Sequence, residues 1–245
     1  MSSDAYSVYL DGQARMIEIV QTLGPDALNT VVPACPAWTV QDLLAHVTAG
    51  VVDSVAGNVP ELEGVNLMDH WKDAAAHGAL EELVSRQIRE RQGRSVSDLL
   101  AEWRAATEQA APMLRGERSF PPGVPPLMEW TIAMDVTVHD DDLRCALGRE
   151  PADPTLPCFV HATTWYGMSL DIRIRDLERP AMRLEAEDVA LDLGEGAPVA
   201  ILRAGAYEMT MALTGRRSEE EIRALDWDGD PSPFLDILSA YTSPS

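Results

Sequence analysis

The segment MEWTIAMDVTVHDDDLRCALG, residues 128–148, carries two ionisable side chains of metal-binding type inside an apolar helical pattern. Asp135 precedes His139 by four residues, a spacing that puts both side chains on one face of a helix, one turn apart. The apolar flanks indicate that this face is buried, where an unpaired aspartate is costly. Carboxylate and imidazole both suit a divalent metal of the zinc type. A simple ion pair on the helix surface is the alternative for these two residues alone.

A third candidate ligand is His46, on the inward-facing row of a helix that we predict to begin after Thr39. Thr39 and Asp42 form a capping-box pattern, which defines this start. Helical bundles commonly build metal sites from a spaced pair on one helix and a single ligand on another. Three protein ligands leave a fourth coordination position open, which is the catalytic rather than the structural arrangement. The alternative for His46 is a core histidine with a hydrogen-bond partner.

Composition limits the classes of partner. The chain has 245 residues, 46% of them hydrophobic, and a formal charge of −21. A protein with this much negative charge is repelled by nucleic acid and by anionic membranes, so we do not expect it to bind either. The sequence shows no signal-peptide pattern, no run of 18 apolar residues and no Cys-x-x-Cys pair among its three cysteines. We therefore expect a cytoplasmic protein without a disulfide framework, and both a monomer and a homodimer remain open.

Hydrophobic periodicity predicts two domains, a helical bundle over residues 1–178 and a small α+β domain over residues 179–245. The change falls at Arg179-Pro180, after which MRLEAEDVALDLG alternates apolar and polar residues as two half-buried strands do. Residues 200–213 are expected to begin as strand and end as helix. Further helices are expected at 6–23, from 39, from about 80, from 95, at 128–148, at 156–174 and at 234–241, with a loop at 57–78.

Two segments carry a family resemblance. CPAWTVQDLLAHV and DVTVHDDDLRCALG resemble the two signatures of the mycothiol-dependent maleylpyruvate isomerase family, whose N-terminal part is a DinB-like four-helix bundle. AGAYEMTMALTGRRS, followed by ALDWDGDP, is similar to the small C-terminal domain of actinobacterial members. The resemblance covers nearly the whole chain. It implies an α+β fold class, with a DinB-like four-helix bundle followed by a small α+β C-terminal domain.

The resemblance also implies roles for individual residues. His46, Asp135 and His139 match the family's zinc ligands, although the family's isomerase has glutamate at the position of Asp135. Arg216 matches the arginine of a Gly-Arg pair that the isomerase uses, and surface charge paired with nearby glutamates is its alternative. Asp142 matches an acidic position that follows the histidine. It would orient a ligand histidine, and a helix cap or a solvent-facing charge is the alternative.

The function that the resemblance implies is that of an enzyme dependent on zinc and on mycothiol, the low-molecular-weight thiol of actinobacteria. The expected reaction is cis-trans isomerisation of a maleylpyruvate-like ene-dione acid, whose carboxylate Arg216 would hold. A mycothiol S-transferase uses the same activated thiolate and is the first alternative. The others are a hydrolase whose metal activates water and a binding protein that keeps the bundle without turnover.

Overall fold

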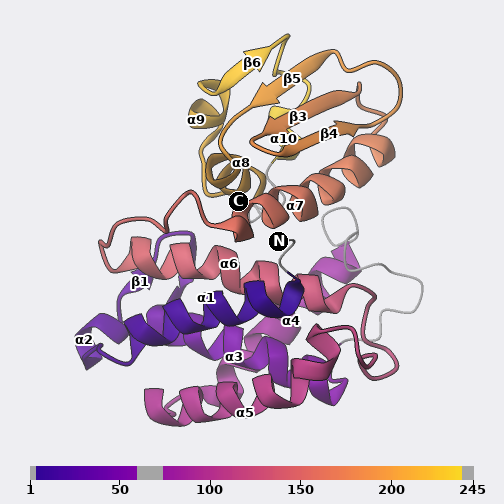
Figure 1. Ribbon diagram of the computed structural model, residues 1–245. Helices are drawn as coiled ribbons and strands as arrows, with labels where there is room; N and C mark the ends of the chain where they lie inside the picture. Colours follow the sequence, from indigo (N-terminus) through magenta and orange to yellow (C-terminus); the bar gives the residue numbers. More distant parts are fainter. Residues whose placement is uncertain (1–3, 60–73, 239–245) are drawn as a thin grey trace. The chain divides into compact units, whose positions relative to one another are not determined.

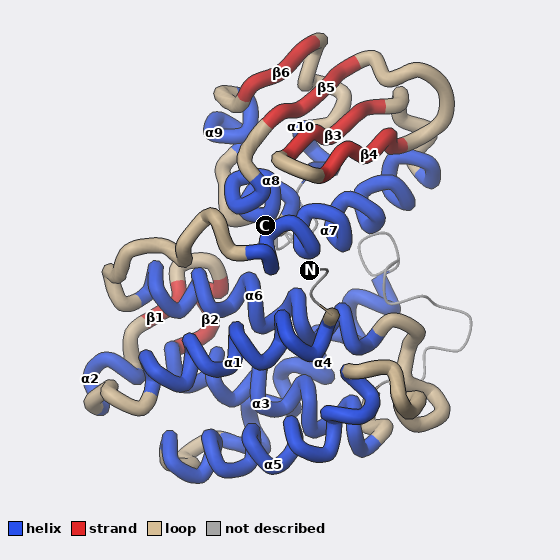
Figure 2. Tube along the Cα trace, in the orientation of Figure 1, coloured by secondary structure: helices blue, strands red, loops and turns tan. Residues whose placement is uncertain are grey.

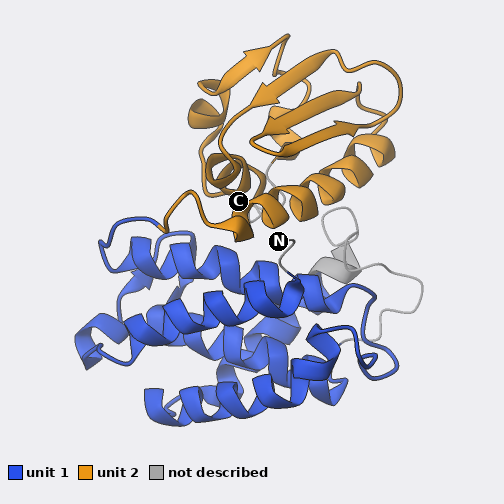
Figure 3. Ribbon diagram, in the orientation of Figure 1, with its two compact units in different colours: residues 1–151 blue, residues 152–245 orange. Residues whose placement is uncertain are grey.

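The computed structural model of the chain describes residues 4–59 and 74–238. Two compact units divide the chain, residues 1–151 and residues 152–245, coloured blue and orange in Figure 3. The predicted domain boundary at 178/179 therefore differs from the observed division by one helix, α7 (Pro157–Asp176). This helix packs against the sheet and against a helix of the second unit, a tertiary preference that helical periodicity alone does not encode.

The first unit is a helical bundle (Figures 1 and 2). Within it α1 packs against α6 and α5, while α3 packs against α5, α4 and α6. Each of these contacts buries the apolar stripe of an amphipathic helix. The elements of this unit are α1 (Ala5–Val20), α2 (Pro25–Leu28), β1 (Val31–Val32), β2 (Cys35–Thr39), α3 (Val40–Ala56), α4 (Ala74–Arg91), α5 (Val96–Leu114) and α6 (Met128–Ala146).

The predicted capping box fixes the start of α3. The Thr39 amide donates to Asp42 Oδ2 at 2.9 Å, and the Asp42 amide donates to Thr39 Oγ1 at 3.2 Å. Both bonds satisfy backbone donors that the first turn of a helix leaves unpaired. Ser95 caps α5 in a similar way, since it accepts from the Asp98 amide. The phase of α3, and with it the direction of its inward row, is thus set locally.

The packing of α1 on α6 depends on Gly12. A Cβ atom at this position would lie 2.7 Å from Val136 Cγ1, closer than real Cβ contacts. The missing side chain lets α1 approach α6 beside Asp135, the residue that precedes Val136 in the chain.

A short antiparallel hairpin precedes α3. Strand β1 pairs with β2, and Val32 lies opposite Cys35. Proline at two positions of this segment conceals the strand pattern, because proline lacks a backbone donor. The hairpin brings Cys35 and Trp38 directly in front of α3.

The second unit combines a four-stranded sheet with helices, so the α+β class is confirmed. The strand order is β4-β3-β5-β6, with β3 and β5 parallel and the other pairs antiparallel. Gly167 of α7 lets the helix sit close to the sheet, since a Cβ there would lie 2.6 Å from Leu191. The elements besides α7 are β3 (Met182–Ala186), β4 (Val189–Leu193), β5 (Ala200–Arg203), α8 (Ala206–Leu213), α9 (Glu219–Arg223), β6 (Asp226–Asp228) and α10 (Leu235–Leu238).

Several local predictions can be compared with these elements. The hairpin β3–β4 and the strand-to-helix change over residues 200–213 are confirmed, whereas α9 and β6 were not predicted. Helix α4 begins at Ala74, inside the predicted loop at 57–78, and most of that loop lies outside the described residues. The end of the predicted helix at 234–241 also lies outside them. Over residues 4–59 and 74–238, no helix combines the length and the apolar character needed to cross a membrane.

Candidate metal centre

The three predicted ligands come together inside the first unit. His46 projects from α3, and Asp135 and His139 project from α6. His46 Nε2 lies 3.5 Å from Asp135 Oδ1, and His139 Nε2 lies 3.4 Å from the same oxygen. One ligand atom from each residue lies within 4.8 Å of the others. The spacing of four residues on α6 and the capped start of α3 together produce this cluster.

The charges of the cluster are strongly coupled. Burial by itself would raise the pKa of Asp135, but the two adjacent histidines lower it well below its usual range. Burial would lower the pKa of His139, but Asp135 and Asp142 together raise it to about 9. The side chain of Asp135 is 34% exposed, compared with 12% for His46 and 8% for His139. The carboxylate therefore lies at the solvent edge of the cluster, with the imidazoles behind it.

Each histidine has a hydrogen-bond partner at its other ring nitrogen. His139 Nδ1 lies 2.8 Å from Asp142 Oδ2, and His46 Nδ1 lies 3.2 Å from Gln87 Oε1. Both partners are oxygen acceptors, so each Nδ1 carries the proton in a neutral ring and each Nε2 keeps a lone pair. Metal-binding histidines commonly show this arrangement. The solvent-facing alternative for Asp142 is wrong, because this residue is only 2% exposed.

Trp38 of β2 lies against both imidazoles. Its ring centroid is 4.9 Å from that of His46 and 6.0 Å from that of His139. The two histidine rings are 5.2 Å apart and nearly perpendicular. The indole thus provides an apolar wall that limits water around the histidines and keeps their rings from turning.

Three residues of the site were not predicted from the sequence. Gln87 belongs to α4, and Asp53 lies seven residues after His46, two turns along the inward side of α3. Cys35 offers its sulfur within 4.8 Å of ligand atoms of His139 and Asp142. Only Asp53 had a usable signal, because an acid two helical turns from a candidate ligand shares its face. Cys35 and Gln87 come from other elements, so only the tertiary structure brings them close.

Arg216 lies in the second unit, at the turn that follows α8. Its guanidinium donates to the Thr214 carbonyl at 2.6 Å. The neighbouring Arg217 forms two 2.9 Å bonds with the carboxylate of Glu208. The catalytic role of Arg216 stays a prediction.

The donor set suits a divalent ion of the zinc type. Two imidazole nitrogens and one carboxylate oxygen form a common three-ligand set, and the fourth position is then free for another molecule. The lowered pKa of Asp135 keeps its carboxylate ready to bind a cation. Water or a thiol in the fourth position would be acidified there.

Comparisons with known proteins match the fold of this chain. The profile of the family described as "Mycothiol maleylpyruvate isomerase N-terminal domain" matches residues 9–144. Two similar crystal structures are those of a mycothiol-dependent maleylpyruvate isomerase and of its histidine-to-alanine mutant. The mutant is 11% identical, with a TM-score of 0.57 over 88% of this chain and 89% of that chain. The other is 14% identical, with a TM-score of 0.51 over 87% and 89%. A comparison with curated proteins gave no significant match.

Proposed function

Since the chain belongs to the family of the mycothiol maleylpyruvate isomerase N-terminal domain, we propose that it is a metal- and mycothiol-dependent enzyme. The reaction proposed is cis-trans isomerisation of a maleylpyruvate-like ene-dione acid. One observation carries the proposal. The Nε2 atoms of His46 and His139 both face Asp135 Oδ1, at 3.5 and 3.4 Å, while both Nδ1 atoms are occupied by oxygen acceptors.

The residues that would hold zinc or a similar ion are His46, Asp135 and His139. When bound, such an ion lowers the pKa of a thiol in its open position, which gives the nucleophile that isomerisation by addition, bond rotation and elimination requires. Asp142 and Gln87 hold the two imidazoles in the orientation that binding needs. Trp38 keeps water away from the imidazole side. Asp135, the most exposed of the three, lies where a small molecule can enter.

Arg216 is the residue that we propose for binding the carboxylate of the substrate. A guanidinium matches a carboxylate with two parallel hydrogen bonds. In a chain with a formal charge of −21, an anionic substrate needs such local positive charge. Replacing Arg216 with lysine should therefore raise KM for an anionic substrate more than it lowers kcat.

Metal analysis tests the first part of the proposal. We expect about one zinc-type ion per wild-type chain after reconstitution, and loss of that ion in His46→Ala and His139→Ala, both still folded. His161→Ala, in α7 of the second unit, is the matched control and should keep the ion. A chain that binds no ion, or a His46→Ala variant that keeps it, contradicts the proposed metal site.

The reaction is tested with mycothiol and maleylpyruvate. An isomerase converts substrate to the trans isomer without consuming thiol, whereas an S-transferase consumes one thiol for each product formed. Thiol titration beside product analysis separates the two. If the metal-loaded protein neither isomerises ene-dione acids nor joins them to mycothiol, the proposed substrate class is wrong, even if the protein binds the metal.

A further inference from the structure

His46 can serve as the proposed metal ligand only in one of its two neutral forms. Its Nε2 atom is the one that faces Asp135, at 3.5 Å. Metal binding through Nε2 requires the lone pair there, so the ring proton must sit on Nδ1. The question is which groups hold the proton at Nδ1. The inference that follows rests on the proposed function, because it concerns the same site.

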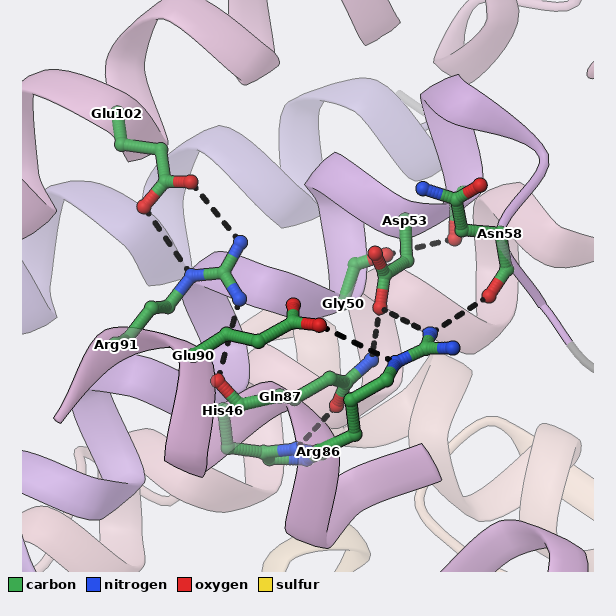
Figure 4. Close-up of polar contacts among 10 residues, drawn as sticks. His46, Gly50, Asp53, Asn58, Arg86, Gln87, Glu90, Arg91 and Glu102 are labelled. Carbon is green, nitrogen blue, oxygen red and sulfur yellow. Dashed lines mark hydrogen bonds and ion pairs between the residues drawn. The ribbon is translucent and has the colours of Figure 1, made fainter. Parts of the chain in front are cut away.

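The amide of Gln87 lies between His46 and Asp53. Figure 4 shows its side chain reaching from α4 toward both residues. Gln87 Oε1 lies 3.2 Å from His46 Nδ1, and Gln87 Nε2 donates to Asp53 Oδ2 at 2.9 Å. Gln87 is 3% exposed and Asp53 is 4% exposed, so water does not readily replace either contact.

Asp53 decides which way the amide points. A carboxylate beside a guanidinium offers only acceptors, and Arg86 lies 3.4 Å from Asp53 Oδ2. If the Gln87 amide were reversed, its oxygen would face the carboxylate and two acceptors would meet. The amide must therefore direct Nε2 to Asp53 and Oε1 to His46. An acceptor at His46 Nδ1 then favours the ring form with the proton on Nδ1.

The backbone around Gln87 is held as well. Arg91 donates to the Gln87 carbonyl at 3.2 Å and forms two bonds, 2.9 and 3.1 Å long, with the carboxylate of Glu102 on α5. These contacts tie this part of α4 to α5 and limit how far the amide can withdraw from His46 (Figure 4).

We infer that Asp53 and Gln87 are positioning residues, which act in series to keep the proton of His46 on Nδ1 and so leave Nε2 free for the metal. At His139 a single residue holds the proton on Nδ1, because Asp142 accepts directly from that nitrogen. The two ligand histidines therefore differ in the charge of their partner, a neutral amide for His46 and a carboxylate for His139.

The test begins with Asp53→Asn, an isosteric change. Asparagine can present either an oxygen or an NH₂ group to Gln87, so the amide is free to reverse. In the metal-free protein, ¹⁵N NMR of labelled histidine reports which ring nitrogen carries the proton. We expect His46, assigned by its absence in His46→Ala, to change from the Nδ1–H form to a mixture. Zinc affinity should fall about tenfold or more.

Glu90→Gln is the matched control. Glu90 lies on α4 and contacts Arg86 at 3.9 Å, but its side chain is 57% exposed, and Figure 4 draws no contact from it to Gln87 or His46. This variant removes one acidic charge near the same guanidinium. It should keep the Nδ1–H form of His46 and a zinc affinity within twofold of wild type.

A reciprocal exchange supplies the rescue. In the double variant Asp53→Asn with Gln87→Glu, the new carboxylate accepts from His46 Nδ1 and the new amide donates to that carboxylate. We expect the Nδ1–H form and the zinc affinity to recover, which a loss of packing would not allow. Should Asp53→Asn not fold, Gln87→Met removes both amide contacts and is expected to give the same mixture of ring forms.

The inference is overturned if His46 keeps the Nδ1–H form in Asp53→Asn, or if the exchange fails to restore it in a folded chain. These outcomes are separate from failure of the proposed function. A wild-type chain that binds no zinc refutes the metal site, while the ring form of His46 in the metal-free protein still decides the roles of Asp53 and Gln87.

Discussion

Binding of a divalent ion at the proposed site should release a proton from His139. In the metal-free protein burial opposes protonation, but Asp135 and Asp142 raise the pKa of His139 to about 9. A group with that pKa is protonated in about 97% of molecules at pH 7.5 and in about half at pH 9. Since the ion needs the unprotonated Nε2, binding at pH 7.5 should release about one proton from this side chain. Below pH 9, affinity should rise about tenfold for each pH unit.

Calorimetry in buffers of different ionisation enthalpy measures this release. Asp142→Asn is the informative variant, because it weakens both the hydrogen bond and the charge that raise the pKa of His139. We expect less proton release at pH 7.5 in this variant, and a weaker dependence of zinc affinity on pH between 7 and 9. Release below about 0.3 proton in the wild-type protein at pH 7.5 would refute the reasoning.

The same pKa predicts how the stability of the metal-free protein changes with pH. The pKa of His139 is higher in the folded protein than in the unfolded chain, where it is near 6.5, so protonation of His139 favours folding. This stabilisation is complete at pH values below about 6.5 and is lost as the pH rises through about 9. The shift corresponds to at most about 3 kcal/mol. Urea unfolding of the metal-free protein should therefore give a lower free energy of unfolding at pH 9.5 than at pH 6.5. An equal or higher value at pH 9.5 contradicts the coupling.

Two further predictions concern the packing that supports the site. Gly12→Ala places a methyl group 2.7 Å from Val136 and should lower the free energy of unfolding by about 1–3 kcal/mol. Gly78→Ala lies on α4 with open space around it and should raise the free energy of unfolding by about 0.5–1 kcal/mol. Urea titrations measure the free energy of unfolding of both variants. Equal changes in the two would contradict the close contact between Gly12 and Val136. Tyr9→Phe removes the hydroxyl that accepts from Trp103 Nε1 at 2.7 Å, and the buried indole N–H left unpaired should cost about 1–3 kcal/mol in the same assay.

A feature could be predicted from the sequence where the residues that determine it lie close together in the chain. The start of α3 lies within four residues, Thr39 to Asp42, so the capping box and the phase of His46 were predictable. Asp135 and His139 share one helix, and their common face follows from helical geometry alone.

The parts that were missed depend on contacts between distant segments. Strands β1 and β2 are too short to show periodicity, and α7 was assigned to the wrong unit because its partners β4 and α8 follow it in the chain. Gln87 lies 41 residues from His46 and carries no ligand chemistry of its own. Its role follows only from the orientation that Asp53 imposes on it.

The different partners of the two histidines have a consequence for the charge of the site. At the proposed site, a divalent ion held by Asp135, with Asp142 behind His139, would form a group without net charge. Asp53 adds no charge either, because Arg86 lies beside it. A neutral amide behind His46 would therefore let the proposed site accept one anionic thiolate at a lower electrostatic cost than a carboxylate at the position of Gln87 would. By the same reasoning, a Gln87→Glu change alone should weaken thiol binding more than it weakens metal binding, and titration of the zinc-loaded variant with mycothiol measures the difference. Equal losses of metal affinity and thiol affinity would show that the charge behind His46 does not control binding of the thiolate.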